Sequence, residues 1–137
     1  MQITVNEKLV ELNFGIRFVR ELDKKYHITL DGGIRVGSGL ENTVPLLMNG
    51  DILILEDVIQ AAAWKAESKL TQEELDDYLD SADDVDALFK SVLEELKNQN
   101  ATRKKTLALV ADLEERAKAE AAMKKVKERI LKTGTKT

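Results

Sequence analysis

The chain contains no cysteine and only one histidine, His27, among its 137 residues. Without cysteine it can form no disulfide and offers no thiolate ligand to a metal ion. A lone histidine has no second imidazole with which to share a transition metal, and Ser-His-Asp catalysis would depend on this same side chain. We therefore interpret His27 as a surface residue and expect no metal site, no cofactor and no catalytic residue.

Long apolar runs and sequence motifs of catalysis are also lacking. The longest apolar runs, such as VPLLM at 44–48, are far shorter than the roughly 20 residues that span a bilayer, and the first residues do not resemble a signal peptide. The glycine-rich stretch DGGIRVGSG at 31–39 fails the G-x-G-x-x-G pattern, because Asn42 stands where the last glycine is needed. We expect this stretch to be an irregular, mobile connector. The acidic stretch from Asp80 lacks the spacing of a calcium-binding EF-hand.

Positive charge is scarce in the first hundred residues and abundant afterwards. Residues 1–100 hold 10 Lys and Arg against 20 Asp and Glu, whereas residues 101–137 hold 11 against 5. The acidity peaks in TQEELDDYLDSADDVD at 71–86. The basic tail could bind nucleic acid, or it could lie against an acidic surface of its own or a neighbouring molecule. We favour the second interpretation because the charges of the tail alternate in sign, as on helix surfaces.

Apolar residues alternate with period two at 2–5 and 9–14, which predicts a short N-terminal β-hairpin. Its turn residues, Asn6 and Glu7, are not the usual Asn-Gly pair, so we expect a looser turn than type I′. From Gly15 the apolar spacing becomes helical and predicts an amphipathic helix over about 15–26. Two strands alone are marginally stable, so this helix should cover one face of the hairpin.

Further helices are predicted along the rest of the chain by apolar spacing and by cap residues. The first is a short helix at 40–48 that contains Pro45, and the second runs from the N-cap Asp51 to about Ser68. A third follows the capping box of Thr71 and Glu74, and a fourth is capped by Asp83. A long helix over 101–132 is capped by Asn100, and its thin apolar seam consists of Leu107, Val110, Leu113, Ala117 and Ala121. The predicted fold class is α+β and mainly helical: a hairpin packed on a bundle of about five helices, with a long C-terminal helical tail. Residues 1–100 should form the globular domain and 101–137 a basic helical tail, frayed or disordered over 133–137.

The opening ITVNEKLVELNFGIRFVRELDKKY resembles the start of the tail assembly chaperones of long-tailed bacteriophages that infect Gram-positive hosts. In that family a hairpin of the form I-x-I/V-N-x-K-x-x-x-L-x-F runs into G-I-x-F-x-R-E-L-D-K. The matching residues are Ile3, Val5, Asn6, Lys8, Leu12, Phe14, Gly15, Ile16, Phe18, Arg20, Glu21, Leu22, Asp23 and Lys24. The similarity continues through VPLLMNGD, LEDVIQAA and TQEELDDYLD and covers about residues 1–105.

The resemblance implies a non-enzymatic assembly factor that acts in the host cytoplasm and is absent from the mature virion. Such a protein coats the long, helical tape measure protein, keeps it soluble and helps recruit tail tube subunits. Many members also have a longer form made by programmed frameshifting, for which Lys104-Lys105 or Lys124-Lys125 mark candidate slippery codons.

A chaperone of this kind needs apolar surface that it can share with a partner helix. The candidate partner-binding residues are Phe14, Phe18, Leu22, Tyr26, Val58 and Trp64. The alternative is that these residues belong to the core, and we favour it for most of them. A homo-oligomer is also expected, with the acidic segment 71–86 of one molecule meeting the basic tail of a neighbour. The alternative function is a small nucleic-acid-associated protein that uses the basic C-terminal tail.

Overall fold

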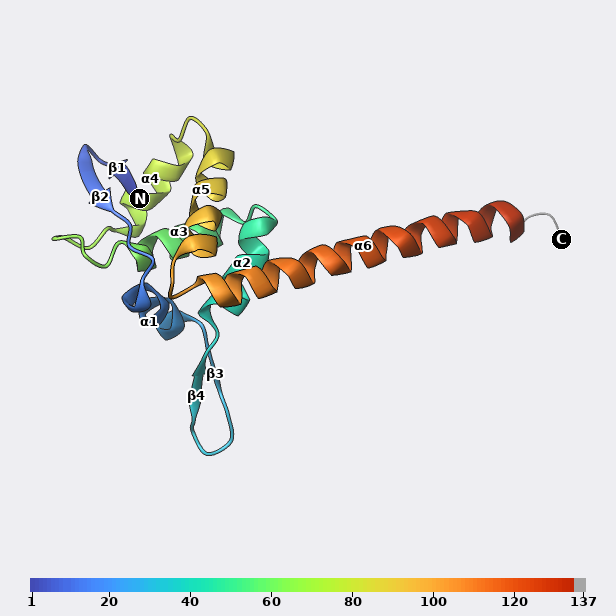
Figure 1. Ribbon diagram of the computed structural model, residues 1–137. Coiled ribbons are helices and arrows are strands. Elements are labelled where there is room, and N and C mark those ends of the chain that lie inside the picture. The colour runs from blue at the N-terminus through green and yellow to red at the C-terminus, as the bar shows by residue number, and fades with distance from the viewer. Residues whose placement is uncertain (135–137) are drawn as a thin grey trace.

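A computed structural model describes residues 1–134 and confirms the mainly helical α+β class. Its elements, in chain order, are β1 (Gln2–Val5), β2 (Lys8–Glu11), α1 (Ile16–Lys25), β3 (His27–Thr29), β4 (Arg35–Gly37), α2 (Gly39–Met48), α3 (Ile52–Ala62), α4 (Gln72–Asp80), α5 (Val85–Asn98) and α6 (Arg103–Gly134). Helices α1 to α5 and the first hairpin form the body, and α6 extends far beyond it (Figure 1). A second hairpin, β3–β4, projects from the body in a different direction (Figure 1).

The first hairpin is present as predicted, but its turn is tighter than expected. Val5 pairs with Lys8, so only Asn6 and Glu7 form the turn, and their φ angles are +51° and +63°. A glutamate in the left-handed region costs about 1–2 kcal/mol. The register explains why this cost is accepted, because a slip of one residue would turn the buried Ile3 and Val5 outward.

Helix α1 begins after Gly15 and ends at Lys25, close to its predicted range. The side-chain oxygen of Asn13 accepts a hydrogen bond from the Gly15 N–H at 3.1 Å, where the chain changes from strand to helix. Phe18 and Leu22 point into the core, and the ring of Phe18 meets that of Phe14 edge to face at 5.0 Å. The predicted amphipathic spacing is thus confirmed at Phe18 and Leu22 but not at Ile16, which is 70% exposed.

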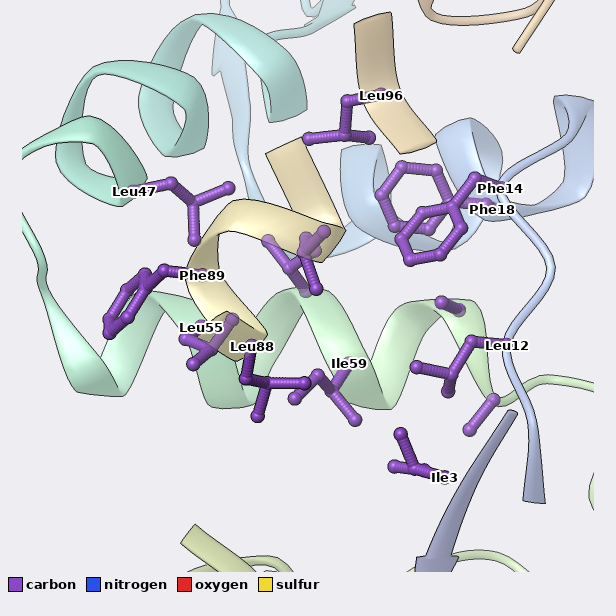
Figure 2. Close-up of a cluster of buried hydrophobic side chains, with 14 of the residues drawn as sticks. Ile3, Leu12, Phe14, Phe18, Leu47, Leu55, Ile59, Leu88, Phe89 and Leu96 are labelled. Atoms are coloured by element: carbon purple, nitrogen blue, oxygen red, sulfur yellow. The ribbon is translucent and has the colours of Figure 1, made fainter. Parts of the chain in front are cut away.

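Helix α3 lies at the centre of the core, and the side chains of α1, α2, α5 and the first hairpin converge on it (Figure 2). Its buried residues Leu55, Val58, Ile59 and Ala62 are all 0% exposed. The N-cap prediction is confirmed, because a carboxylate oxygen of Asp51 accepts hydrogen bonds from two backbone N–H groups of the first turn. The helix ends at Ala62, earlier than predicted, and its last carbonyl, that of Ala62, accepts a hydrogen bond from the Asn13 N–H of the opening segment at 2.9 Å.

The caps of α4 and α5 decide where these two helices begin. The predicted capping box of α4 is present: Thr71 Oγ1 accepts from the Glu74 N–H at 3.1 Å, and Glu74 Oε1 accepts from the Thr71 N–H at 3.2 Å. Helix α5 is capped by Asp84 rather than Asp83, since the Asp84 carboxylate accepts from the Ala87 N–H at 2.9 Å. Helix α2 continues through Pro45, and Gly50, with φ +78°, lies just beyond its end.

Helix α6 begins at Arg103, so Asn100 is not its N-cap. Its contact face agrees with the predicted seam at Val110, which is buried, but otherwise differs: Thr102 and Thr106 are buried, whereas Leu107 is 46% exposed. Thr102 Oγ1 donates to the Leu96 carbonyl of α5 at 2.7 Å, which anchors the start of α6 on the body. Every residue from 114 to 133 is exposed, so the predicted seam residues Ala117 and Ala121 pack against nothing among residues 1–134. The first two residues of the predicted disordered end, 133–137, continue α6, and the other three lie outside the described residues.

The glycine-rich segment is a β-hairpin, contrary to the prediction of an irregular connector. β3 and β4 pair antiparallel, and the Leu30 N–H donates to the Ile34 carbonyl at 2.7 Å, extending the pairing by one position. The three-residue tip places Gly32 and Gly33 at φ +86° and +82°, which glycine adopts readily. The glycines therefore make a tight tip and do not loosen the whole segment.

Candidate partner-binding surface

The structure divides the six sequence-predicted contact residues between the core and its rim. Four of them lie in the core at 0–2% exposure: Phe14, Phe18, Leu22 and Val58. Tyr26 and Trp64 are half-buried at the rim. Side chains as buried as the first four would reach a partner only if the body opened, so their contact with a partner stays a prediction.

Tyr26 joins the end of α1 to α3 through a hydrogen bond. Its phenol donates to Asp57 Oδ2 at 2.6 Å, and Lys25 forms an ion pair with the other oxygen of the same carboxylate. Burial, together with the negative charge of Asp57, raises the pKa of Tyr26 far above its usual range. The phenol therefore stays protonated and holds the two helices together.

Trp64 lies just beyond the end of α3, beside a hollow of about 530 Å³ between α1 and α3. The guanidinium of Arg17 lies 5.0 Å from the centre of the indole ring, at cation–π distance. The indole Nε1 is buried and has no hydrogen-bond partner. The contacts of the indole ring are therefore with cationic side chains, Arg17 and also Lys65 at 5.5 Å.

The β3–β4 hairpin carries the most exposed apolar sheet face of the described residues. Ile28 lies opposite Val36, and Leu30 lies opposite Ile34. Since side chains two apart in a strand share a face, all four lie on one side of the hairpin. Their exposed fractions are 55% for Ile28, 49% for Leu30, 62% for Ile34 and 44% for Val36. We call these four residues the hairpin face.

The other side of the same hairpin is polar. His27, Thr29 and Arg35 occupy it, and Arg35 Nη2 lies 2.8 Å from His27 Nε2. The histidine is exposed, as the sequence predicted. A hairpin that is apolar on one side only, and that projects from the body, can cover another apolar surface. Sequence reasoning missed this site, although the period-two apolar positions on either side of Gly32-Gly33 could have indicated it.

Asp23 of α1 holds the base of the hairpin where it meets α2. One carboxylate oxygen accepts a hydrogen bond from the Gly39 N–H at 2.8 Å. A Cβ atom on Gly37 would lie 2.1 Å from the other oxygen, and one on Gly39 would lie 2.7 Å from the first. Gly37 and Gly39 therefore leave room for the Asp23 carboxylate at the base of the hairpin.

A second exposed apolar surface runs along the distal half of α6. Met123, Val126 and Ile130 are 59%, 48% and 61% exposed. Their spacing of three and four residues places them on one face of the helix. Together with Ala119, we call them the α6 stripe.

Glu56 of α3 is a buried carboxyl close to Asp76 of α4. Burial, and the hydrogen bond and negative charge of Asp76, raise the pKa of Glu56 to about 7. Because this pKa lies above the ordinary value of 4.5, the folded protein binds more protons than the unfolded chain between these two pH values. The free energy of unfolding should therefore fall as the pH rises from about 4.5 to 7.

Replacing Glu56 with glutamine should remove this decrease in the free energy of unfolding with rising pH. We expect Glu56→Gln to be more stable than wild type by roughly 1–2 kcal/mol at pH 8, with little difference at pH 4.5. Urea unfolding of both proteins at the two pH values measures the effect, with Glu11→Gln on β2 as the control for loss of an exposed carboxylate. A variant that gained no stability at pH 8 would show that Glu56 is ionised without cost.

The described part of the chain offers neither a metal site nor a membrane-spanning helix. No group of three or more His, Asp or Glu side chains within residues 1–134 could hold a metal ion. No helix of the same residues has the length and apolar character needed to cross a membrane. The hairpin face and the α6 stripe are exposed apolar surfaces of the kind that contacts another polypeptide.

Comparison with known proteins agrees with this conclusion. A family model described as "Phage tail assembly chaperone protein, TAC" matches residues 2–112. The match covers the whole body, including the β3–β4 hairpin, and ends within the proximal part of α6. No curated protein and no solved structure matches the chain.

Proposed function

Because the chain belongs to the phage tail assembly chaperone family, a family of non-enzymatic assembly factors, we propose that it coats the tape measure protein during tail assembly. In this role it keeps the tape measure protein soluble and helps recruit tail tube subunits. It acts in the host cytoplasm and is absent from the mature virion. Restriction to phages of Gram-positive hosts, a longer frameshifted form, and the division into a 1–100 domain and a 101–137 tail belong to the same proposal.

The observation that carries the proposal is the hairpin face. Four half-exposed apolar side chains on one side of a projecting two-stranded sheet are an unusual feature in a small protein with 34% charged residues. A helical partner presents apolar residues at i, i+3, i+4 and i+7, which such a flat face can cover. The polar opposite side of the hairpin then faces water, so a coated partner becomes soluble.

We also propose that Tyr26 and Trp64, both half-buried at the rim of the core, take part in this contact. Tyr26 precedes β3 directly in the chain, and Trp64 lines the hollow beside α1. We propose that the partner lies first on the hairpin face and then reaches this rim. The buried residues Phe14, Phe18, Leu22 and Val58 support the surface from below, and their direct contact remains part of the hypothesis.

Co-expression tests the proposed function. Fragments of a helical tape measure protein that precipitate alone should remain soluble when expressed with the full chain, and the purified product should contain several copies of the chain for each fragment. An unrelated acidic helical protein of similar size serves as the control for general solubilisation. If the fragments precipitate equally with and without the chain, the proposed function is wrong.

A further inference from the structure

The hollow between α1 and α3 combines an apolar floor with a basic border. Leu22 and Leu70, which are 1% and 5% exposed, are among the residues that line it. Arg17, Lys25 and Lys69 line it as well, and all three are exposed to solvent. Its volume of about 530 Å³ lies within the range of roughly 300–1,000 Å³ that is typical of ligand-binding clefts. A bound group can therefore place an apolar part on the floor and a charged part at the border.

Positive charge is concentrated at this hollow although the body of the protein is acidic. Residues 1–100 hold 10 Lys and Arg against 20 Asp and Glu. Three of these ten basic residues line the hollow, and a fourth, Lys65, lies 5.5 Å from the centre of the Trp64 ring beside it. Lys69 forms no ion pair within residues 1–134, so its ammonium group is available to a ligand. The hollow therefore attracts a negatively charged group to a molecule that repels it elsewhere on the body.

The carboxylates close to the hollow leave this attraction in place. Glu21 and Asp57 line it, but each already has a cationic partner. Lys24 Nζ lies 2.9 Å from a carboxylate oxygen of Glu21, and Lys25 forms an ion pair with Asp57. Glu67, the acidic residue of the loop between α3 and α4, is exposed and does not line the hollow. A ligand carboxylate thus meets no unpaired negative charge in the lining.

Trp64, the only tryptophan of the chain, adds a hydrogen-bond donor at the edge of the hollow. Its ring is half-buried, and its centre lies 5.0 Å from the guanidinium of Arg17. The indole N–H can only donate, and it has no acceptor among the described residues. Because a buried donor without an acceptor is destabilising, a ligand that carries oxygen atoms is favoured here. The ring has to turn toward the ligand for this bond to form, because Nε1 is covered.

We propose that the hollow between α1 and α3 binds an acidic segment of the polypeptide that covers the hairpin face. An apolar side chain of the segment lies on the floor, and its carboxylates lie beside Arg17, Lys25 and Lys69. The inference deepens the proposed function and rests on it for the identity of the partner. Lys25 ends α1, and β3 begins two residues later, so one partner can span both surfaces. The hairpin face then selects apolar surface, and the hollow selects the charge next to it.

The acidic body argues against a nucleic acid as the occupant. Residues 1–100 carry a net charge of −10, since 10 basic residues are set against 20 acidic ones. A long polyanion would meet this charge on either side of the hollow, whereas a short acidic segment meets the basic border alone. A phosphate backbone also has no apolar side chain to cover Leu22 and Leu70. A polypeptide segment uses both the floor and the border.

The fluorescence of Trp64 tests the inference on the full chain, because the only tryptophan lies at the proposed site. The probes are two blocked synthetic peptides with leucine at the same positions, one with glutamate and the other with lysine at the remaining positions. The acidic peptide should change the fluorescence to saturation, and added salt should weaken its binding. The basic peptide should bind at least about 10-fold more weakly.

The variant Arg17→Gln with Lys69→Gln removes two charges from the border at exposed positions, so folding should be kept. We expect it to bind the acidic peptide at least about 10-fold more weakly than wild type. Titration calorimetry is measured as well, because Arg17 contacts the fluorescent ring. The matched control is Arg20→Gln with Lys90→Gln, which removes one Arg and one Lys at exposed positions outside the hollow. It should bind as wild type does, and thermal unfolding checks that both variants are folded.

Three results would overturn the inference: equal binding of the two peptides, wild-type binding by the Arg17 and Lys69 variant, or displacement of the acidic peptide by single-stranded DNA of equal charge as readily as by the peptide itself. These results are separate from the co-expression test. Tape measure fragments that stay soluble while the acidic peptide fails to bind would overturn this inference alone. Peptide binding as expected, together with fragments that precipitate, would overturn the proposed function alone.

Discussion

Phe18→Ala is expected to lower the free energy of unfolding by about 3–5 kcal/mol. The side chain is 0% exposed, meets the Phe14 ring edge to face, and lies between α1 and the central α3 (Figure 2). Truncation removes the burial of a whole aromatic ring and leaves a cavity that the surrounding helices can fill only in part. Urea unfolding followed by circular dichroism measures the loss.

Ile16→Ala provides the control on the same helix. Ile16 is 70% exposed, so its truncation should change stability by no more than about 0.5 kcal/mol. A Phe18→Ala protein that stayed as stable as wild type but lost its partner would contradict this expectation. That result would show that Phe18 contacts the partner directly, as in the sequence-based hypothesis that lists it among the partner-binding residues.

Changing all four residues of the hairpin face to threonine should weaken binding of a tape measure fragment about 100-fold or more. Each side chain is roughly half exposed, so burying its apolar surface under a partner contributes about 1 kcal/mol to the free energy of binding. Threonine keeps the β-propensity of the strands, and the positions are exposed, so folding should be nearly unaffected. Titration calorimetry measures the affinity, and thermal unfolding measures the stability of the variant.

The control removes exposed apolar surface from other faces of the body. Leu9→Thr with Leu53→Gln does so at two positions that are both 67% exposed. We expect this double variant to bind as wild type does. If the threonine variant also bound unchanged, the hairpin face would not be the contact surface, while the co-expression result would still decide the proposed function.

Elements whose signals are local were predicted well. The capping box of Thr71 and Glu74 joins residues three apart, and the spacing of Phe18 and Leu22 is set within one helix. The mainly helical α+β class and the first hairpin follow from the same kind of periodicity. These features depend on neighbours in the chain, which the sequence displays directly.

Errors arose where a distant contact decided the local structure. The segment around Gly32-Gly33 was predicted to be irregular because its glycines were counted, yet the pairing of Ile28 with Val36 makes it a hairpin. Helix α3 ends at Ala62, and the carbonyl left free there accepts a hydrogen bond from the Asn13 N–H, 49 residues earlier in the chain. The left-handed Glu7 is tolerated because the strand register that buries Ile3 and Val5 is worth more than the strain.

The amino-acid sequence by itself determined the class of the fold, the buried face of α1 and the uneven charge of body and tail, because periodicity and charge are properties of the chain. The tertiary structure alone decided which apolar side chains remain exposed. Burial depends on what packs from elsewhere, so Phe14, Phe18, Leu22 and Val58 became core, while Ile28, Leu30, Ile34 and Val36 were left on the surface. Asp23 of α1 lies against Gly37 and Gly39 at the base of the hairpin that carries this second set, and no reading of adjacent residues could show this contact.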